Sequence, residues 1–532
     1  METVLGIDTG GTYTDAVLLD KKTNTVLKKA KSPTTRGDLA LGIAKSIDGL
    51  GLDDTAAIEK VVLSTTLATN AIVEGEGRAT GLIIIGELPK GELPDNAMAR
   101  VQGKINIKGK EVTPLDMAEV AAACAQIAPG VEAFAVAGMM STRNASQELA
   151  VKAFISETYK LPVVCSHELS SQLGFHDRTV TAVLNASLIP ILREFIDGVK
   201  RTLTAKGIAA PVYMVKGDGN LASLSFILEK PIESILSGPA ASIIGALSLA
   251  KCSDGIVVDM GGTTTDSGVV LDNTLTLAPI GAKVGDWQTQ IDSAQINTYG
   301  LGGDTQILAV DGAPRLTGHR VLPACRGGKD GVTPTDILHC TGDFEAWDKA
   351  LAEAALQAQT TQTVSDYAEK IQAMLLGTIK TEVLEQYDSH LPVVAIGAPA
   401  RAWYEKIAET TDYQVIVPEH HEVANAVGAA MASVEERVTA LVRPDEENDG
   451  YVAHIGGLCK SFSDKDEAVA FASEEAKKQS IAAAKAQGLK EASAQVFAED
   501  IVEKIGWRTR YIETKIKAVA KATTLKLKMQ DN

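Results

Sequence analysis

Aromatic residues are scarce in this chain, making up 4% of its 532 residues. Proteins that hold single-stranded nucleic acid stack the bases on aromatic side chains, so a stacking platform of that kind is not expected. Basic residues are also outnumbered, since 51 Lys and Arg stand against 68 Asp and Glu for a formal net charge of −17. Non-specific binding to nucleic acid depends on Lys and Arg neutralising phosphates. The composition therefore argues against a nucleic-acid partner.

Several catalytic and metal-binding signatures are missing from the sequence. The 6 cysteines form no Cys-x-x-Cys pair, and the chain has no His-Glu-x-x-His, Gly-x-Ser-x-Gly or Gly-x-x-x-x-Gly-Lys-Ser/Thr segment. These absences argue against a zinc ribbon, a zinc protease, an elbow-type serine hydrolase and a P-loop ATPase. Among the cysteines, Cys325 lies in a glycine-rich stretch and stays a candidate nucleophile, provided that a base lies nearby.

Long apolar runs are also missing, and none approaches the length that a membrane span requires. The N-terminus lacks the basic start of a signal peptide and enters a predicted core strand by Val4. We therefore expect a cytoplasmic protein with no membrane partner. With 45% hydrophobic residues, the chain has enough apolar material for the cores of two or three domains.

The chain does contain one short phrase twice. Residues 8–15 read Asp-Thr-Gly-Gly-Thr-Tyr-Thr-Asp, and residues 259–266 read Asp-Met-Gly-Gly-Thr-Thr-Thr-Asp. Apolar runs stand before and after both copies, which predicts a strand, a glycine-rich turn and a second strand in each case. Two such hairpins indicate two similar half-molecules whose turns face one shared ligand.

The chemistry of these turns suits a phosphate. Glycine pairs let the backbone come close to a ligand, and the exposed N–H groups of such a turn cradle phosphate oxygens. The carboxylates at the strand ends would repel phosphate unless a cation such as Mg²⁺ lies between them. The alternative is that Asp-x-Gly-Gly is an ordinary hairpin turn. The predicted phosphate ligands are Gly10, Gly11, Thr12, Thr14, Gly261, Gly262, Thr263 and Thr264, and the predicted metal ligands are Asp8 and Asp259.

The two segments resemble the phosphate loops of the actin, sugar-kinase and chaperone ATPase superfamily. Within it, the chain is similar to the hydantoinase A and oxoprolinase family, a resemblance that covers residues 1–440. It implies two α/β domains of RNase H-like topology, as in actin-like ATPases, around a nucleotide cleft that holds ATP and Mg²⁺. The further segments that carry the resemblance are 64–71 (STTLATNA), 179–186 (TVTAVLNA), 236–241 (LSGPAA) and 424–430 (ANAVGAA).

The resemblance also implies an activity. Enzymes of this family use ATP to phosphorylate the carbonyl of a cyclic amide, such as a hydantoin, oxoproline or a related lactam, so that water can break the C–N bond. They often work with a second subunit, here one like hydantoinase B, and a homo-oligomer is an open alternative. A small-molecule kinase and a non-catalytic ATP-dependent conformational protein, a reactivase or an actin-like filament, also remain open. The substrate is not specified by the sequence.

Two segments depart from the family pattern. The family's Gly-Ala-Gly-Gly-Gly-Ser is GLGGDT at residues 300–305, and its Pro-Ala-Cys-Tyr-Gly is PACRGG at residues 323–328. The glycine pair of the first segment is predicted to approach phosphate or ribose. The turn after the apolar run at 393–396 stands where actin-like ATPases pass the adenosine. The residues predicted from these two turns are Gly302, Gly303, Gly397 and Ala398.

Phosphoryl transfer needs charge neutralisation and an oriented nucleophile. Asp8, Asp266 and Asp304 are the predicted catalytic carboxylates, and Asp15 is a further candidate. The plainer alternative for Asp15 and Asp266 is that each holds its own hairpin turn. Which carboxylate positions the nucleophile stays open at this point.

The domain organisation follows from the repeat. Residues 1–205 are predicted to form the first actin-like domain, 206–442 the second, with its own phosphate loop and the adenosine loop, and 443–532 a small C-terminal α/β extension of open role. Within the first domain, apolar runs alternate with helix-like stretches and predict one mixed sheet. Those runs are 61–64, 81–85, 131–137 and 161–165. Residues 444–451 are polar and turn-rich, and are predicted to be a linker.

Overall fold

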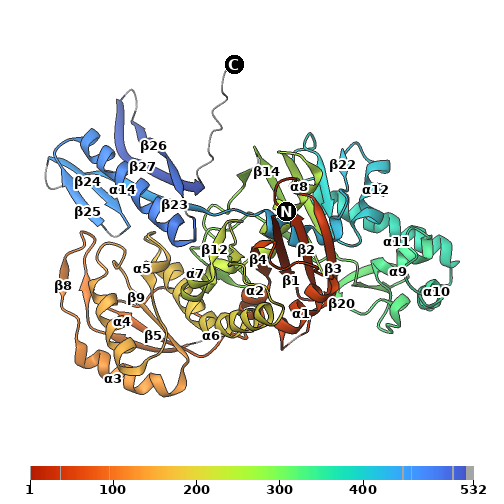
Figure 1. Ribbon diagram of the computed structural model, residues 1–532, viewed down its shortest axis with the longest axis horizontal. Coiled ribbons are helices and arrows are strands. Elements are labelled where there is room, and N and C mark those ends of the chain that lie inside the picture. The colour runs from red at the N-terminus through yellow and green to blue at the C-terminus, as the bar shows by residue number, and fades with distance from the viewer. Residues whose placement is uncertain are drawn as a thin grey trace.

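Two of the sheets in the computed structural model share one topology (Figure 1). In each, a three-stranded antiparallel meander is followed by two strands that run parallel to the first strand of the meander. This is the RNase H-like arrangement, so the predicted mixed α/β fold with two actin-like halves is confirmed. The first sheet, in spatial order, is β12 (Leu221–Ser223), β11 (Val212–Val215), β4 (Ile58–Thr65), β1 (Thr3–Thr9), β2 (Tyr13–Asp20) and β3 (Val26–Pro33); the third is β15 (Thr274–Leu275), β14 (Thr265–Leu271), β13 (Gly255–Met260), β21 (Val393–Ile396) and β22 (Val415–Ile416), with β18 (Asn297–Tyr299) also paired to β14.

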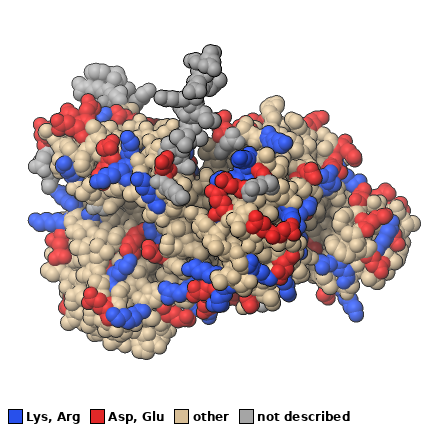
Figure 2. All heavy atoms as spheres, viewed as in Figure 1, with Lys and Arg blue, Asp and Glu red and all other residues tan. Residues whose placement is uncertain are grey.

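The structure describes residues 2–35, 37–94, 96–272, 274–445, 449–456, 458–489, 491–505 and 508–522. The last ten residues of the predicted C-terminal extension, 523–532, lie outside this part of the chain. On the face of the molecule drawn in Figure 2, acidic and basic side chains are interspersed.

A separate four-stranded sheet, the second sheet, is inserted in the sequence between β4 and β11 of the first sheet. Its strands are all parallel, and their spatial order is β10-β9-β5-β6. Helices α3 and α4 precede β9 and β10, whereas no helix is described between β5 and β6. The prediction of one mixed sheet for this region was therefore wrong: residues 61–64 pair in the first sheet, and the other three apolar runs pair with one another. Periodicity identifies a strand but not its neighbours. The elements are β5 (Thr80–Ile85), β6 (Ala97–Val101), α3 (Met117–Ile127), β9 (Ala133–Gly138), α4 (Ser146–Tyr159), β10 (Val163–Cys165) and α5 (Ser166–Leu169).

Helix α6 (Phe175–Ala205) joins the first and second sheets. Its apolar residues share one core with strand residues of both, such as Leu63 and Leu82, and the helix continues through Pro190. By length and composition alone α6 could cross a membrane, which corrects the expectation that no segment is long and apolar enough. However, 78% of its most apolar window is buried inside the fold, as in the core helix of a globular protein.

Two helices form the layers between the first and third sheets. Helix α13 (Ala424–Met431) packs on the first sheet, helix α8 (Ser237–Ala250) packs on the third, and the two helices pack on each other. Their backbones nearly touch, because a Cβ on Gly428 would lie 1.8 Å from the carbonyl oxygen of Ala241, and a Cβ on Gly245 would lie 1.9 Å from that of Ala424. Small residues at these positions hold the two halves together at close range.

The C-terminal part forms a five-stranded antiparallel sheet covered by one long helix. Arg443, Pro444 and Asp445 belong to its first strand, and Asp445 pairs with Gly450 across a hairpin. The prediction of a linker at 444–451 was therefore wrong, because polar turn residues are common to linkers and hairpins. The elements are β23 (Glu435–Asp445), β24 (Gly450–Ile455), β25 (Leu458–Phe462), α14 (Lys465–Ala486), β26 (Ala492–Ile505) and β27 (Arg508–Ala522).

The remaining elements surround these layers. In the first half they are α1 (Leu39–Gly49), α2 (Leu67–Val73), β7 (Lys104–Ile105), β8 (Glu111–Thr113) and α7 (Leu224–Glu229); in the second they are β16 (Lys283–Val284), β17 (Trp287–Gln288), β19 (Thr305–Val310), β20 (Ala313–Arg320), α9 (Pro334–Thr341), α10 (Lys349–Gln357), α11 (Val364–Thr378) and α12 (Ala400–Thr410).

Candidate functional site

The two glycine loops close with the same hydrogen bond. In the first loop the amide of Gly10 donates to the carbonyl of Tyr13 at 3.0 Å. In the second loop the amide of Gly261 donates to the carbonyl of Thr264 at 2.9 Å. Both loops line one cavity of about 650 Å³, a volume in the usual range for a small-molecule site. The phrase that is repeated in sequence is thus repeated in structure, and both copies face one space.

A third loop is fixed to the second by backbone hydrogen bonds. The amide of Gly303 donates to the carbonyl of Gly261 at 2.9 Å, and the amide of Asp304 donates to that of Gly262 at 2.7 Å. A Cβ on Gly302 would lie 2.5 Å from the carbonyl carbon of Gly262, so only glycine permits this approach. The departure from the family pattern at 300–305 therefore forms part of the wall of the cavity.

A fourth loop completes that wall after strand β21. Gly397 has φ +97°, and a Cβ on it would lie 2.2 Å from the carbonyl oxygen of Met260. Its amide donates to the carbonyl of His421 at 3.0 Å. Gly397 and Ala398 both line the cavity, so the predicted adenosine loop lies beside the phosphate loops.

The structure brings most of the predicted site residues together. Those that line the cavity are Gly10, Gly11, Thr12, Asp259, Gly261, Gly262, Thr264, Asp266, Gly303, Asp304, Gly397 and Ala398, together with Asp15. Asp8, Thr14, Thr263 and Gly302 do not belong to the lining. Thr14 is buried with its Oγ1 3.1 Å from that of Thr34, and Thr263 is exposed. Asp8 lies behind the first loop, where a Cβ on Gly10 would be 3.8 Å from its Oδ2.

Four aspartates converge below the two loops. Asp8 faces Asp15 across the first hairpin, and Asp259 faces Asp266 across the second. Burial, together with the negative charge of Asp15 and Asp259, raises the pKa of Asp8 to about 7. Burial raises the pKa of both Asp15 and Asp266 to about 6, and raises that of Asp259. Such a set of poorly solvated carboxylates fits a hard divalent cation such as Mg²⁺, which would offset their charge.

The carboxylates differ in their neighbours. Ser64 donates to Asp8 at 2.6 Å and Ser242 donates to Asp259 at 2.7 Å, so each strand-end carboxylate has one serine that fixes its orientation. Asp304 is already paired, since Arg320 Nη2 lies 3.1 Å from its Oδ2. Burial still raises the pKa of Asp304, although Arg320 opposes that shift.

Sequence reasoning missed several residues of the cavity. Lys31 on β3 reaches the first loop and lies 2.9 Å from Asp15, which leaves a cation beside the predicted phosphates. Phe344 and Trp347 form an edge-to-face pair with ring centroids 5.6 Å apart, and the guanidinium of Arg326 lies 5.1 Å from the ring of Trp347. All four side chains line the cavity, but no local sequence signal links them, because they come from three separate parts of the chain: β3, the turn at Arg326, and the segment between α9 and α10.

Replacing Trp347 with alanine is expected to weaken nucleotide binding by roughly tenfold or more, the typical value of one aromatic side chain stacked on a base. The ring pair supplies the flat apolar surface that a nucleobase needs, near the adenosine loop. Calorimetric titration with ADP and Mg²⁺ measures the change. Phe497→Ala, at an exposed position on β26, serves as the control. Unchanged ADP affinity in Trp347→Ala would show that the base binds elsewhere.

Cys325 lies in a buried turn that the carboxylate of Asp336 holds in place. Its amide and that of Ala324 donate to the carboxylate of Asp336, at 2.7 Å and 3.0 Å, and its side chain is buried. Burial raises the pKa of the Cys325 thiol, and the charge of Asp336 adds to that effect. A thiol held in its neutral form is a poor nucleophile, which argues against Cys325 as a nucleophile. The segment 323–328 is a loop that Asp336 anchors.

Other segments that carried the resemblance do not line the cavity but connect the helices to the strands behind it. Ser237 Oγ donates to the carbonyl of Thr65 at 2.9 Å, and the amide of Leu236 donates to Thr69 Oγ1 at 3.0 Å, which ties the start of α8 to the residues after β4. The side-chain amide of Asn185 on α6 holds residues 229–232. Its nitrogen donates to the backbone carbonyl of Glu229, and its oxygen accepts from the backbone N–H of Ile232. These contacts connect the helices to the strand ends that carry the loops.

Two similar halves with matching glycine loops on one cavity define a protein with the actin-like ATPase fold. The chain belongs to the hydantoinase/oxoprolinase family: the family model of the hydantoinase/oxoprolinase N-terminal region matches residues 4–159, and that of hydantoinase/oxoprolinase matches residues 178–438. The recognition of this family from the sequence is thereby confirmed.

Named relatives fall into two kinds of enzyme. The alpha subunit of caprolactamase from Pseudomonas jessenii is 31% identical over 378 residues, which are 62% of this chain and 53% of the relative. The gamma subunit of acetophenone carboxylase from Aromatoleum aromaticum is 26% identical over 422 residues, 67% of this chain and 57% of the relative. The chain thus spans about half the length of the curated relatives that it matches.

Solved structures show the same fold. Nucleotide-free acetone carboxylase, from work on ATP-dependent acetone carboxylation, aligns with a TM-score of 0.74 at 18% identity, covering 98% of this chain and 88% of the other. The ATP-dependent caprolactamase from Pseudomonas jessenii aligns with a TM-score of 0.73 at 20% identity, covering 98% and 87%. The family therefore includes carboxylases as well as amidohydrolases that depend on ATP.

Proposed function

We propose that this protein uses ATP to hydrolyse a cyclic amide through phosphorylation of the amide carbonyl. The observation that carries the proposal is the pair of glycine loops that share one hydrogen-bond pattern and line a single cavity. Loops of this kind present backbone N–H groups to phosphate oxygens. The caprolactamase relative supports the substrate class, since its name states a lactam.

The proposed reaction has three steps. The lactam oxygen attacks the γ-phosphorus of ATP, ADP leaves, and the carbonyl carbon becomes bonded to a phosphorylated oxygen. Water then adds to that carbon and the C–N bond opens, which gives an amine and an acyl phosphate. A second water hydrolyses the acyl phosphate to a carboxylate and inorganic phosphate. The stable amide resonance is removed in the first step, which is where the energy of ATP is used.

Each group of cavity residues has a proposed role in binding ATP or Mg²⁺. The first and second loops would hold the phosphates, Lys31 would offset the charge on the transferred group, and the pair Phe344 and Trp347 would hold the base. Asp8 and Asp259, each oriented by a serine, are the proposed ligands of Mg²⁺ through its water shell. When bound, Mg²⁺ supplies charge neutralisation and positions the phosphate oxygens.

A second candidate is ATP-dependent carboxylation, in which a ketone is the substrate. It is favoured by the carboxylase relatives, which match this chain over a similar length. Both candidates use the same cavity for ATP and differ in the group that receives the phosphate. The cavity by itself favours neither, so product analysis has to separate them.

A partner subunit is part of the proposal. Caprolactamase and the two carboxylases are each named as subunits of larger enzymes. We infer that the carbonyl substrate is processed in a complex with a hydantoinase B-like subunit, and that this chain supplies the nucleotide site. A homo-oligomer is the alternative, and the mass of the purified complex distinguishes the two.

The decisive experiment is a substrate screen of ATP turnover. Hydantoin, 5-oxoproline and caprolactam are supplied in one set, and acetone or acetophenone with bicarbonate in another, with the co-purified partner present. Turnover that rises with a lactam and yields the ring-opened amino acid supports the first candidate, and a carboxylated ketone supports the second. Magnesium-dependent ADP binding with no turnover on any compound would favour a conformational ATPase, and no ADP binding at all would overturn the proposal.

A further inference from the structure

A second cavity lies at the carboxyl edge of the parallel sheet β10-β9-β5-β6. From β5 the chain passes to β6 on one side of it and later returns to β9 on the other side, so the connections diverge between β5 and β9. Ligands of open parallel sheets bind in the crevice at such a switch point, outside the carboxyl ends of the strands. The cavity of about 330 Å³ is lined there by the strand-end residues Ile85, Gly86, Gly103 and Gly138.

This cavity is distinct from the nucleotide site. No described residue lines both, and the second sheet has its own core, separate from that of the third sheet. Its floor is buried and polar, with Ser141, Gln147 and Glu148 each less than a tenth exposed. The rim carries the exposed side chains of Glu87, Arg100, Gln102 and Lys104.

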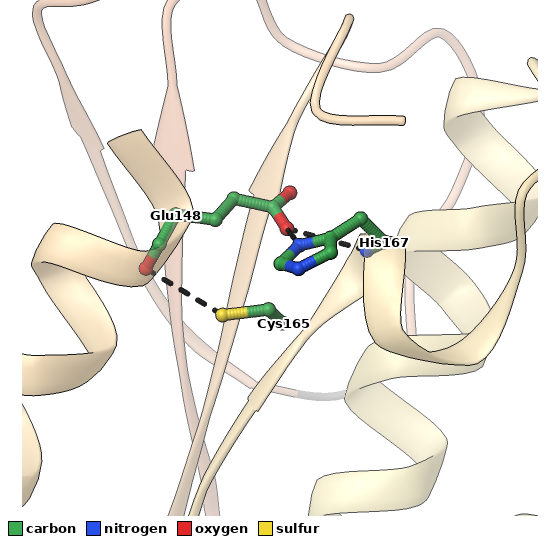
Figure 3. A group of neighbouring side chains, drawn as sticks. All are labelled: Glu148, Cys165 and His167. Atoms are coloured by element: carbon green, nitrogen blue, oxygen red, sulfur yellow. Dashed lines mark hydrogen bonds and ion pairs between the residues drawn. The ribbon is translucent and has the colours of Figure 1, made fainter. Parts of the chain in front are cut away.

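The floor is held rigid by the carboxylate of Glu148. One of its oxygens accepts from the amide of Gly138 and the hydroxyl of Ser166, both at 2.7 Å, and the other accepts from the amide of His167 at 3.2 Å and lies 2.5 Å from Nδ1 of that residue. Figure 3 shows the His167 ring directed at this carboxylate, and the thiol of Cys165 on the backbone carbonyl of Glu148. Cys165 and His167 both form hydrogen bonds with Glu148, so we read these three residues as support for the cavity and not as a metal site.

One acceptor on the floor is left open. The amide nitrogen of Gln147 donates to Glu111 at 3.1 Å and to the carbonyl of Thr113 at 2.8 Å, which fixes the orientation of the side-chain amide. Its Oε1 accepts no hydrogen bond from any described residue, although the side chain is only 5% exposed. A Cβ at position 103 would lie 2.8 Å from this oxygen, so Gly103 keeps it accessible. This oxygen therefore faces the cavity as an open hydrogen-bond acceptor.

The groups around this acceptor favour an anion. Helix α4 begins at the cavity, where the amide of Ser146 already donates to Asn144 Oδ1 at 3.0 Å and the following amides of the first turn remain, and the positive end of a helix attracts a carboxylate. Arg100 uses Nε on the carbonyl of Gly86, which leaves the two terminal nitrogens of its guanidinium for a ligand. Lys104 stands beside it on the rim, paired with Glu87 at 3.3 Å.

We propose that this cavity binds a small carboxylate that also carries an N–H donor, that is, an amino acid. The carboxylate meets Arg100 and the start of α4, and the nitrogen donates to Oε1 of Gln147. The geometry of the second sheet carries this proposal without the nucleotide site. If the proposed lactam hydrolysis is also right, its ring-opened product is an amino acid and is then one candidate ligand of this cavity.

The test is calorimetric titration of the whole protein with glycine, glutamate and 6-aminohexanoate, and with propionate and butylamine as one-sided probes. At least one amino acid is expected to bind saturably and more tightly than either one-sided probe, with the same affinity when ADP is saturating. Arg100→Ala and Gln147→Met are each expected to weaken that binding by roughly tenfold, the typical value of one charge-assisted or buried hydrogen bond. Lys90→Ala, an exposed cation outside the lining, should leave it unchanged.

Two results would overturn the site. One is the absence of saturable binding by any of the three amino acids to protein that unfolds cooperatively on heating. The other is an amino-acid affinity that both variants leave unchanged, since the ligand would then bind elsewhere. Arg100 lies on the exposed rim, so Arg100→Ala keeps the test valid if Gln147→Met fails to fold. Neither result bears on ATP turnover, so this site and the proposed reaction fail independently.

Discussion

Replacing Asp8 with asparagine is expected to leave the fold intact and to slow ATP turnover by about a hundredfold or more, the usual cost of losing one preorganised charged group. The fold should tolerate the change because burial raises the pKa of Asp8 to about 7, so its neutral form is already well populated in the folded protein at neutral pH. Asparagine keeps the oxygen that accepts from Ser64 and removes the charge that would orient Mg²⁺. Steady-state ATP hydrolysis and thermal unfolding, measured on the same preparation, separate the two effects.

The control for this variant is Asp197→Asn, which removes an exposed carboxylate from α6. It should match the parent protein in both measurements. Full turnover in a folded Asp8→Asn protein would exclude Asp8 from the metal site. The role would then pass to Asp15, Asp259 or Asp266, which line the cavity directly.

Adding a single methyl group at Gly428 is expected to destabilise the whole protein by about 3 kcal/mol or more, at the upper end of the cost of overpacking. The new Cβ would lie 1.8 Å from the carbonyl oxygen of Ala241. That neighbour is helix backbone, which cannot move aside as a flexible side chain would. Gly428→Ala should therefore lower the midpoint of thermal unfolding strongly or abolish the folded protein, although alanine is the better helix former.

Gly377→Ala is the matched control, because the same substitution falls in α11 with no atom within 4 Å of the added Cβ. It should stabilise slightly, by about 0.5–1 kcal/mol, through helix propensity alone. A Gly428→Ala protein that unfolds at the temperature of the parent would contradict the close packing of α8 on α13. The pair of variants thus separates a steric effect from a propensity effect with one chemical change.

The sequence predicted the parts of the fold that depend on local pattern. The two hairpins were found because each copy of the repeat carries its own apolar runs and glycines. The partners of a strand are not local information. For that reason the second sheet was merged with the first, and a hairpin at 444–451 was taken for a linker.

Only one side of the cavity could be predicted from the sequence. Its phosphate side comes from contiguous glycine loops, and these lie where they were expected. The base side is built from Arg326, Phe344 and Trp347, which stand in loops and beside helices with no periodic signal. Lys31 is a lysine on a strand that also carries Lys28 and Lys29, and nothing in the sequence singles it out.

The contact between α8 and α13 also bears on how the nucleotide would enter and leave. Backbone lies against backbone there, and we expect the two halves to rotate relative to each other about this crossing when a nucleotide binds or leaves. Asn425 on α13 lines the cavity and Ser242 on α8 bonds Asp259, so a rotation at this crossing would act directly on the wall of the cavity. Opening would then widen the cavity while leaving the core of each half undisturbed.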